Sequence, residues 1–173
     1  GGGVVIKTRS NPMPQEETVT EQRVQIAEGV RAVADRVHEL RDELIAAGEK
    51  PLLRGEWRIR DALSHLAARS NSVALVHKRI ADQDKEQVLT IDEVNHGQVD
   101  ERRDDLVADL IDEIVSGSEA VLTELDTLSD AFLEQTVKVN FGPGEMPAST
   151  IILFGGPRHF HQHIGDIEEA LRA

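Results

Sequence analysis

The sequence contains no cysteine, and aromatic residues make up only 3% of its 173 residues. Without cysteine, the chain forms no disulfide, no zinc–thiolate site and no cysteine nucleophile. Hydrophobic residues make up 39%, so the core must be built largely from Leu, Ile, Val and Ala. Such a core favours packed helices over a β-sandwich. A chain of this length is expected to form one domain.

Basic side chains and long apolar runs are also scarce. The chain has 19 Lys and Arg against 32 Asp and Glu, which gives a formal net charge of -13. This charge repels phosphate backbones and anionic lipid surfaces, so we expect no nucleic-acid partner and no membrane partner. The longest apolar run, near Ile151–Phe154, is far shorter than the roughly 20 residues that span a bilayer. We therefore expect a cytoplasmic protein.

The N-terminal residues differ in composition from the rest. Residues 1–17 carry Gly, Lys, Arg, Ser, Asn and Pro and lack the apolar centre of a signal peptide. We expect them to form a flexible N-terminal lead or to be partly a remnant of cloning, with Met13 as a natural start. The domain itself is then expected to cover residues 18–173.

Apolar residues recur at spacings of three and four in four segments, which is typical of amphipathic helices. Capping-box patterns open two of these segments, Thr18 with Glu21 and Thr90 with Glu93. Gly48 followed by Pro51 should end the first helix. The predicted helices cover residues 18–47, 58–81, 91–126 and 149–172.

Glycines and prolines mark the expected irregularities. Gly97 and Gly117 are weak points at which the third helix could bend. Gly155-Gly-Pro157 should kink or restart the fourth helix, because proline removes a donor and clashes one turn back. Residues 129–148 lack a regular period and include Asn140-Phe-Gly-Pro-Gly144, which predicts a loop. The expected fold is all-α, a four-helix bundle with a long loop between helices three and four.

Three histidines form the clearest candidate site. His159 and His163 lie four residues apart in the apolar stripe of the last helix, where two ring nitrogens can converge on one ion. His65 flanks the apolar stripe of the second helix and is the best candidate for a third ligand. Three imidazoles would leave an open position for water or substrate. The alternative is that these are hydrogen-bonded core histidines without a metal.

Other histidines have no partner at ligand spacing. His161 lies about 200° around the helix from His159 and should face solvent. His38, His77 and His96 are likewise expected to be surface or satisfied residues. Trp57, the single tryptophan, is expected to pack where the second helix begins.

Several motifs resemble the DinB-like superfamily, and most of all the metal-binding domain of mycothiol-dependent maleylpyruvate isomerases. The likeness covers residues 18–172. The motifs that carry it are Gly55-Glu-Trp57, Arg60-Asp-Ala-Leu-Ser-His65-Leu-Ala, Thr90-Ile-Asp-Glu-Val-Asn95 and His159-xxx-His163.

The resemblance implies a four-helix bundle with a divalent metal, usually zinc or nickel. In this family one histidine of helix two and a pair in helix four hold the ion, which implies His65, His159 and His163 as ligands. Two departures are present. Arg58 stands where the family usually places a Ser or Thr cap. The isomerases also carry a C-terminal domain, whereas this chain ends at Ala173, so maleylpyruvate is not expected to be the substrate.

An ion held by three histidines can lower the pKa of bound water toward about 7, polarise a carbonyl or bind a thiol. The resemblance favours a thiol-dependent S-transferase or isomerase, in which a small thiol such as mycothiol or bacillithiol attacks a small electrophile. No catalytic residue is assigned. Zinc or nickel is the expected metal, although copper and iron also accept imidazoles.

Two alternatives remain open. One is a metal-dependent hydrolase, for which Asp61 and Asp166 are candidate groups beside the ligands. The other is a non-enzymatic metal-binding stress-response module, which could form a homodimer through a helix face.

Overall fold

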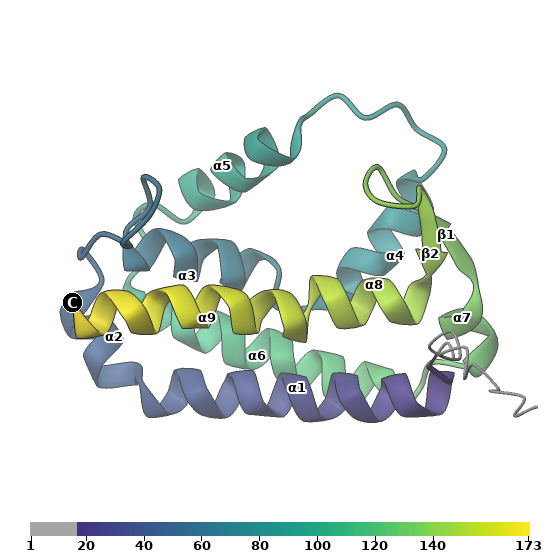
Figure 1. Cartoon of the computed structure of the whole chain (residues 1–173), viewed down its shortest axis with the longest axis horizontal. Coiled ribbons are helices and arrows are strands. Elements are labelled where there is room, and N and C mark those ends of the chain that lie inside the picture. Colours follow the sequence, from purple (N-terminus) through teal and green to yellow (C-terminus); the bar gives the residue numbers. More distant parts are fainter. Residues whose placement is uncertain (1–16) are drawn as a thin grey trace, which may run out of the picture.

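The computed structural model describes residues 17–173, and these are mostly helical (Figure 1). This agrees with the predicted all-α class. The expected flexible lead over residues 1–17 lies outside the described residues, apart from Glu17. The helices are α1 (Val19–Glu39), α2 (Arg41–Ala47), α3 (Ile59–Ala68), α4 (Ser72–Asp82), α5 (Ile91–Glu101), α6 (Val107–Leu125), α7 (Asp130–Glu134), α8 (Ala148–Gly155) and α9 (Pro157–Arg172).

The predicted helix 18–47 is wrong as a single helix, because the chain turns at Leu40. The Leu40 N–H still donates to the carbonyl of Arg36 at 3.0 Å, and α2 then leaves the direction of α1 (Figure 1). Leu40 and Leu44 are both buried in the same core as Val37. The turn therefore lets apolar residues on both sides of the break reach one core. Gly48 follows the end of α2, as predicted.

The predicted helices 58–81 and 91–126 are also each divided in two. Between α3 and α4, the Asn71 side chain accepts a hydrogen bond from the Ala74 N–H at 3.0 Å and so begins a new helix. Between α5 and α6, Arg102 pairs with Glu113 at 2.7 Å, which folds the end of α5 back toward α6. Gly97 and Gly117, the expected bend points, lie inside α5 and α6.

The predicted loop at 129–148 is partly ordered. It contains α7 and an antiparallel hairpin of β1 (Thr136–Lys138) and β2 (Glu145–Pro147), in which Val137 pairs with Met146. The predicted turn lies between the strands, where Gly142 and Gly144 adopt positive φ angles of 54° and 83°. The strands have three residues each, too few for a readable alternation of apolar and polar positions.

The last helical segment restarts at Pro157, as predicted. Proline is the first residue of α9, where a missing N–H is harmless. α8 and α9 follow one another along the length of α1 (Figure 1). The backbone is tight at Gly156, since a Cβ there would lie 2.5 Å from the Ile152 carbonyl oxygen and 2.8 Å from Ser72 Oγ.

Two clusters of buried apolar residues fill the interior. One gathers residues of α2, α3 and α9, and the other gathers residues of α4, α7 and α8, while α1 and α6 contribute to both. α5 contacts α3 on the outside and has no buried residue. Within residues 17–173, no helix combines the length and apolar character that crossing a membrane requires.

Candidate metal centre

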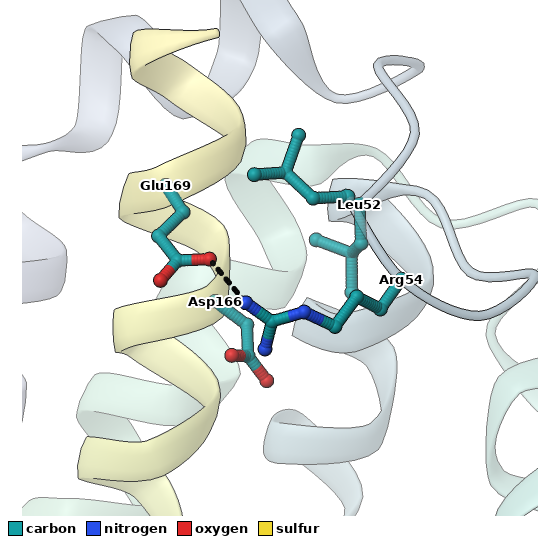
Figure 2. Close-up of a pocket in the computed structure, with 5 residues that line it drawn as sticks. Leu52, Arg54, Asp166 and Glu169 are labelled. Atoms are coloured by element: carbon teal, nitrogen blue, oxygen red, sulfur yellow. Dashed lines mark ion pairs between the residues drawn. The ribbon is translucent and has the colours of Figure 1, made fainter.

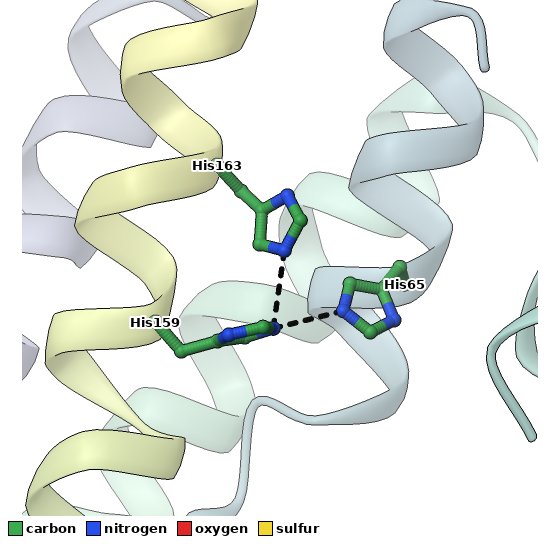
Figure 3. Close-up of side chains that lie close together, drawn as sticks. All are labelled: His65, His159 and His163. Carbon is green, nitrogen blue, oxygen red and sulfur yellow. Dashed lines mark hydrogen bonds between the residues drawn. The ribbon is translucent and has the colours of Figure 1, made fainter. Parts of the chain in front are cut away.

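The structure brings the three predicted histidines together. His65 comes from α3, and His159 and His163 come from successive turns of α9 (Figure 3). The Nε2 atom of His159 lies 2.9 Å from Nε2 of His65 and 3.1 Å from Nε2 of His163. One ligand atom from each ring falls within 4.8 Å of the other two.

This spacing fits a divalent ion. Tetrahedral zinc binds histidine nitrogens at roughly 2.0–2.1 Å, which sets neighbouring ligand atoms about 3.3 Å apart. The two Nε2 separations from His159 are slightly shorter, so small side-chain rotations suffice to admit an ion. The donor set of three imidazoles also suits zinc, nickel, copper and iron.

Burial keeps the three imidazoles neutral at pH 7. It lowers the pKa of His65 to about 4, assisted by the charges of His163 and Arg69 and opposed by the hydrogen bond to Gln98. It lowers the pKa of His159 to about 3, again with help from His163 and Arg69. The pKa of His163 is lowered by burial too, although Asp166 opposes this. Neutral rings have a free lone pair, the form in which histidine binds metals.

Gln98 on α5 orients His65. The Nδ1–H of His65 donates to the Gln98 side-chain oxygen at 2.7 Å, which leaves the Nε2 lone pair of His65 directed toward the other histidines. Gln98 was not predicted from the sequence. No local pattern marks it, because its place over α3 depends on the break between α5 and α6.

Trp57 covers one side of the histidine cluster. Its ring centre lies 5.2 Å from that of His65 and 6.3 Å from that of His163. It therefore packs at the start of α3, as predicted, and also contacts the candidate ligands. An indole at this position shields the imidazoles from water on one side.

Asp61 is buried one turn before His65, but its hydrogen bonds go to Arg58. The carboxylate accepts from the Arg58 backbone N–H at 2.9 Å and from the guanidinium at 3.0 Å. Within residues 17–173, no hydrogen bond joins Asp61 to a histidine. Its observed contacts hold the start of α3, where Arg58 replaces the usual Ser or Thr cap.

Asp166 lies on α9, three residues after His163, and lines a small surface pocket with Leu52, Arg54 and Glu169 (Figure 2). Arg54 pairs with Glu169 at 3.5 Å. Asp166 acts on the site through its charge, which raises the pKa of His163 against the effect of burial. No hydrogen bond joins the Asp166 carboxylate to any of the described residues.

The remaining histidines are separate from the cluster. His38, His77, His96 and His161 are all exposed, as their sequence positions predicted. His77 stacks near Phe132, with ring centres 4.8 Å apart. His161 lies on the same helix as two of the candidate ligands and is therefore a natural control for them.

No protein-family model matches the sequence, and no curated protein matches it significantly. The DinB-like assignment thus stays a prediction from sequence motifs.

Proposed function

We propose that this chain is a DinB-like four-helix-bundle metalloprotein, and that it acts as a thiol-dependent S-transferase or isomerase. His65, His159 and His163 would hold a divalent ion, with zinc or nickel as the expected metal. The observation that carries the proposal is the convergence of three neutral imidazoles from two helices at ligand spacing.

The composition of the cluster supports an open coordination position. Among residues 17–173, no fourth His, Asp or Glu joins the group. Catalytic zinc sites commonly have three protein ligands and leave one position to water or substrate. When bound, such an ion would supply Lewis acidity that lowers the pKa of a coordinated thiol or water.

The resemblance to mycothiol-dependent isomerases is what favours a thiol reaction over hydrolysis. The chain has no cysteine, so the thiol must come from a small molecule of the mycothiol or bacillithiol type. Hydrolysis would need a general base near the ion; the Asp61 carboxylate is engaged by Arg58, which leaves Asp166 as the remaining candidate. Gln98 fixes the orientation of His65, and Trp57 gives the reacting molecule an apolar wall.

Metal content tests the first half of the proposal. Untagged protein would be incubated with zinc or nickel, desalted and assayed by elemental analysis, beside His65→Ala, His159→Ala and His163→Ala. We expect about one ion per chain in the wild type and a large loss in each variant, because two imidazoles bind far more weakly than three. His161→Ala is the matched control and should keep its metal. Wild-type protein that stays metal-free would overturn the proposal.

A conjugation assay tests the second half. Metal-loaded protein would be mixed with mycothiol or bacillithiol and 1-chloro-2,4-dinitrobenzene, and the coloured thioether followed by absorbance. We expect thioether formation above the uncatalysed rate, lost in His65→Ala and retained in His161→Ala. Metal-loaded protein that hydrolyses p-nitrophenyl acetate but forms no thioether would favour the hydrolase instead.

A further inference from the structure

Arg69 caps the C-terminal end of α3, four residues after His65, and its side chain has no hydrogen-bond or ion-pair partner among the described residues. Its side chain is half-buried, and its Nε atom is fully buried without a hydrogen bond. Within residues 17–173, no hydrogen bond or ion pair engages its side-chain nitrogens; only its backbone N–H is bonded, to the Leu66 carbonyl at 3.1 Å. Burying a charged group in this way is unfavourable unless something compensates for it.

This isolation is unusual in a chain with a net charge of -13. Among the described arginines, only Arg69 and Arg79 combine a half-buried side chain with the absence of an ion pair. The other arginines without an ion pair are exposed, namely Arg31, Arg103, Arg158 and Arg172. Acidic side chains are plentiful, so the structure leaves these two cations free of them.

Arg79 adds to the positive charge around Arg69. Burial, followed by the charge of Arg79, lowers the pKa of Arg69. The Arg79 guanidinium lies 5.6 Å from the centre of the Phe141 ring, its one charged or aromatic partner among the described residues. The two guanidinium charges thus repel each other, and no ion pair among the described residues neutralises either one, a combination that a bound anion would relieve.

A second unsatisfied group lies at the same place. Ser72 is 4% exposed, and its Oγ is buried without a hydrogen-bond partner. Ser72 Oγ lies beside Gly156, and Arg69 Nη2 lies 3.5 Å from the position of a Cβ on Gly155. Both groups therefore border the junction of α8 and α9. Ser72 is also the first residue of α4, where free backbone N–H groups add to the positive potential.

This junction adjoins the histidine cluster. Gly155 precedes His159 by four residues, across the break at Gly156, and Arg69 follows His65 by four residues. The charge of Arg69 lowers the pKa of all three candidate ligands, so its field reaches each of them.

We propose that Arg69, assisted by Ser72, binds the carboxylate of the small molecule that the metal centre acts on. This inference rests on the proposed function, and it names the substrate class as a carboxylate-bearing thiol or electrophile. The planar guanidinium presents paired N–H donors that match a carboxylate, and the serine hydroxyl supplies a further donor. Carboxylate binding would compensate for groups that the fold leaves unpaired.

The first test uses metal-free wild-type protein, so it is independent of the metal. The Arg69 Nε–H signal would be followed by ¹H–¹⁵N NMR, assigned by its loss in Arg69→Lys, during titration with sodium acetate. Sodium chloride at equal ionic strength is the control. We expect acetate to shift this signal in a saturable way and chloride to leave it nearly unchanged. Equal responses to the two salts would overturn the inference.

The second test joins the two sites. Zinc-loaded protein would be titrated calorimetrically with 3-mercaptopropionate and with its neutral amide. We expect the carboxylate form to bind roughly 10- to 100-fold more tightly, the usual range for hydrogen bonds to charged groups. Arg69→Met should abolish this ratio, and Arg31→Met, an exposed control, should keep it. A preference that survives Arg69→Met would overturn the inference.

The outcomes separate the two proposals. If neither thiol binds zinc-loaded protein, the thiol half of the proposed function fails, and the acetate titration alone decides the role of Arg69. Substituted acrylates would serve as electrophiles, each compared with its neutral amide. If both thiols bind equally well and substituted acrylates show no preference for a carboxylate either, the metal centre stands and the carboxylate site falls. If the acrylates bind more tightly with a carboxylate and the thiols do not, the carboxylate that Arg69 binds belongs to the electrophile.

Discussion

The two ends of α3 each carry an arginine, and the structure treats them in opposite ways. At the start, Arg58 is bound by the buried carboxylate of Asp61 through its guanidinium and its backbone N–H. At the end, Arg69 has a buried Nε without a partner. The first arrangement stabilises the fold, whereas the second destabilises it unless a ligand binds. The same helix thus separates groups that serve folding from groups available for binding.

The largest effect is expected where the end of α3 meets α6. A Cβ on Gly117 would lie 2.0 Å from Ser70 Oγ and 2.9 Å from its backbone carbon, so the backbone itself would have to move. We expect Gly117→Ala to lower the free energy of unfolding by about 3 kcal/mol, the upper range for overpacking. Urea unfolding would measure it. Gly97→Ala, with open space around it, is the control and should not destabilise. If Gly117→Ala unfolds at the same urea concentration as the wild type, the close contact between Gly117 and Ser70 is contradicted.

Breaking the pair of Asp61 and Arg58 at the start of α3 should have the next largest effect on the free energy of unfolding. Asp61→Asn leaves the Arg58 guanidinium without its buried carboxylate and weakens the cap of α3. We expect a loss of about 2 kcal/mol in unfolding free energy, since a partly exposed partner softens the penalty of a broken buried pair. Asp35→Asn, at an exposed position, should change stability little. Equal stabilities for the two variants would show that the pair contributes nothing.

The same pair predicts a pH dependence. Burial raises the pKa of Asp61, but hydrogen bonds from the side chain and backbone of Arg58 outweigh it, so the pKa is lowered overall. The stabilisation is therefore present above the unfolded pKa of about 3.9 and is lost as pH falls through the folded value. The difference between wild type and Asp61→Asn should shrink from pH 7 to about pH 3. A constant difference in urea unfolding across this range would argue against the ion pair.

Replacing Arg69 should have the smallest effect on the free energy of unfolding, and this effect should be a gain in stability. Arg69→Met replaces an unpaired, half-buried charge with an apolar side chain of similar length. We expect metal-free protein to gain about 1 kcal/mol, because replacing unpaired buried charges is often neutral or stabilising. Arg58→Met at the other end of α3 should lose stability. Differential scanning calorimetry of both variants gives the comparison, and a clear loss in Arg69→Met would indicate a structural partner for this arginine.

Much of the helical content is predictable, because apolar spacing is local information. The positions at which the predicted helices break are not predictable from local sequence, with one exception. The chain turns at Leu40, and this turn lets residues on both sides of it pack in one core. No residue near Leu40 indicates a helix end. Asn71, in contrast, is a common helix cap, and its position before Ser72 could have indicated the start of α4. The three-residue strands were too short to detect.

The candidate metal centre is likewise predictable from the sequence only where the signal is local. The spacing of His159 and His163 is local and predicts one shared ion directly, while their approach to His65 follows only from the packing of α3 against α9. The position of Arg69 near the histidines could have been predicted in the same way, since it follows His65 by four residues. That of Gln98 could not, because α5 reaches His65 only through a tertiary contact.

α5 buries none of its residues, yet it supplies Gln98, the hydrogen-bond acceptor for His65. Helices held by few buried contacts open more often than the core, and their amide protons exchange sooner. The cluster therefore combines two levels of local stability, with its imidazoles on core helices and its orienting amide on a helix that buries none of its residues. The tautomer of His65 is then governed by the docking equilibrium of α5, which links the basicity of a core imidazole to the motion of a surface helix.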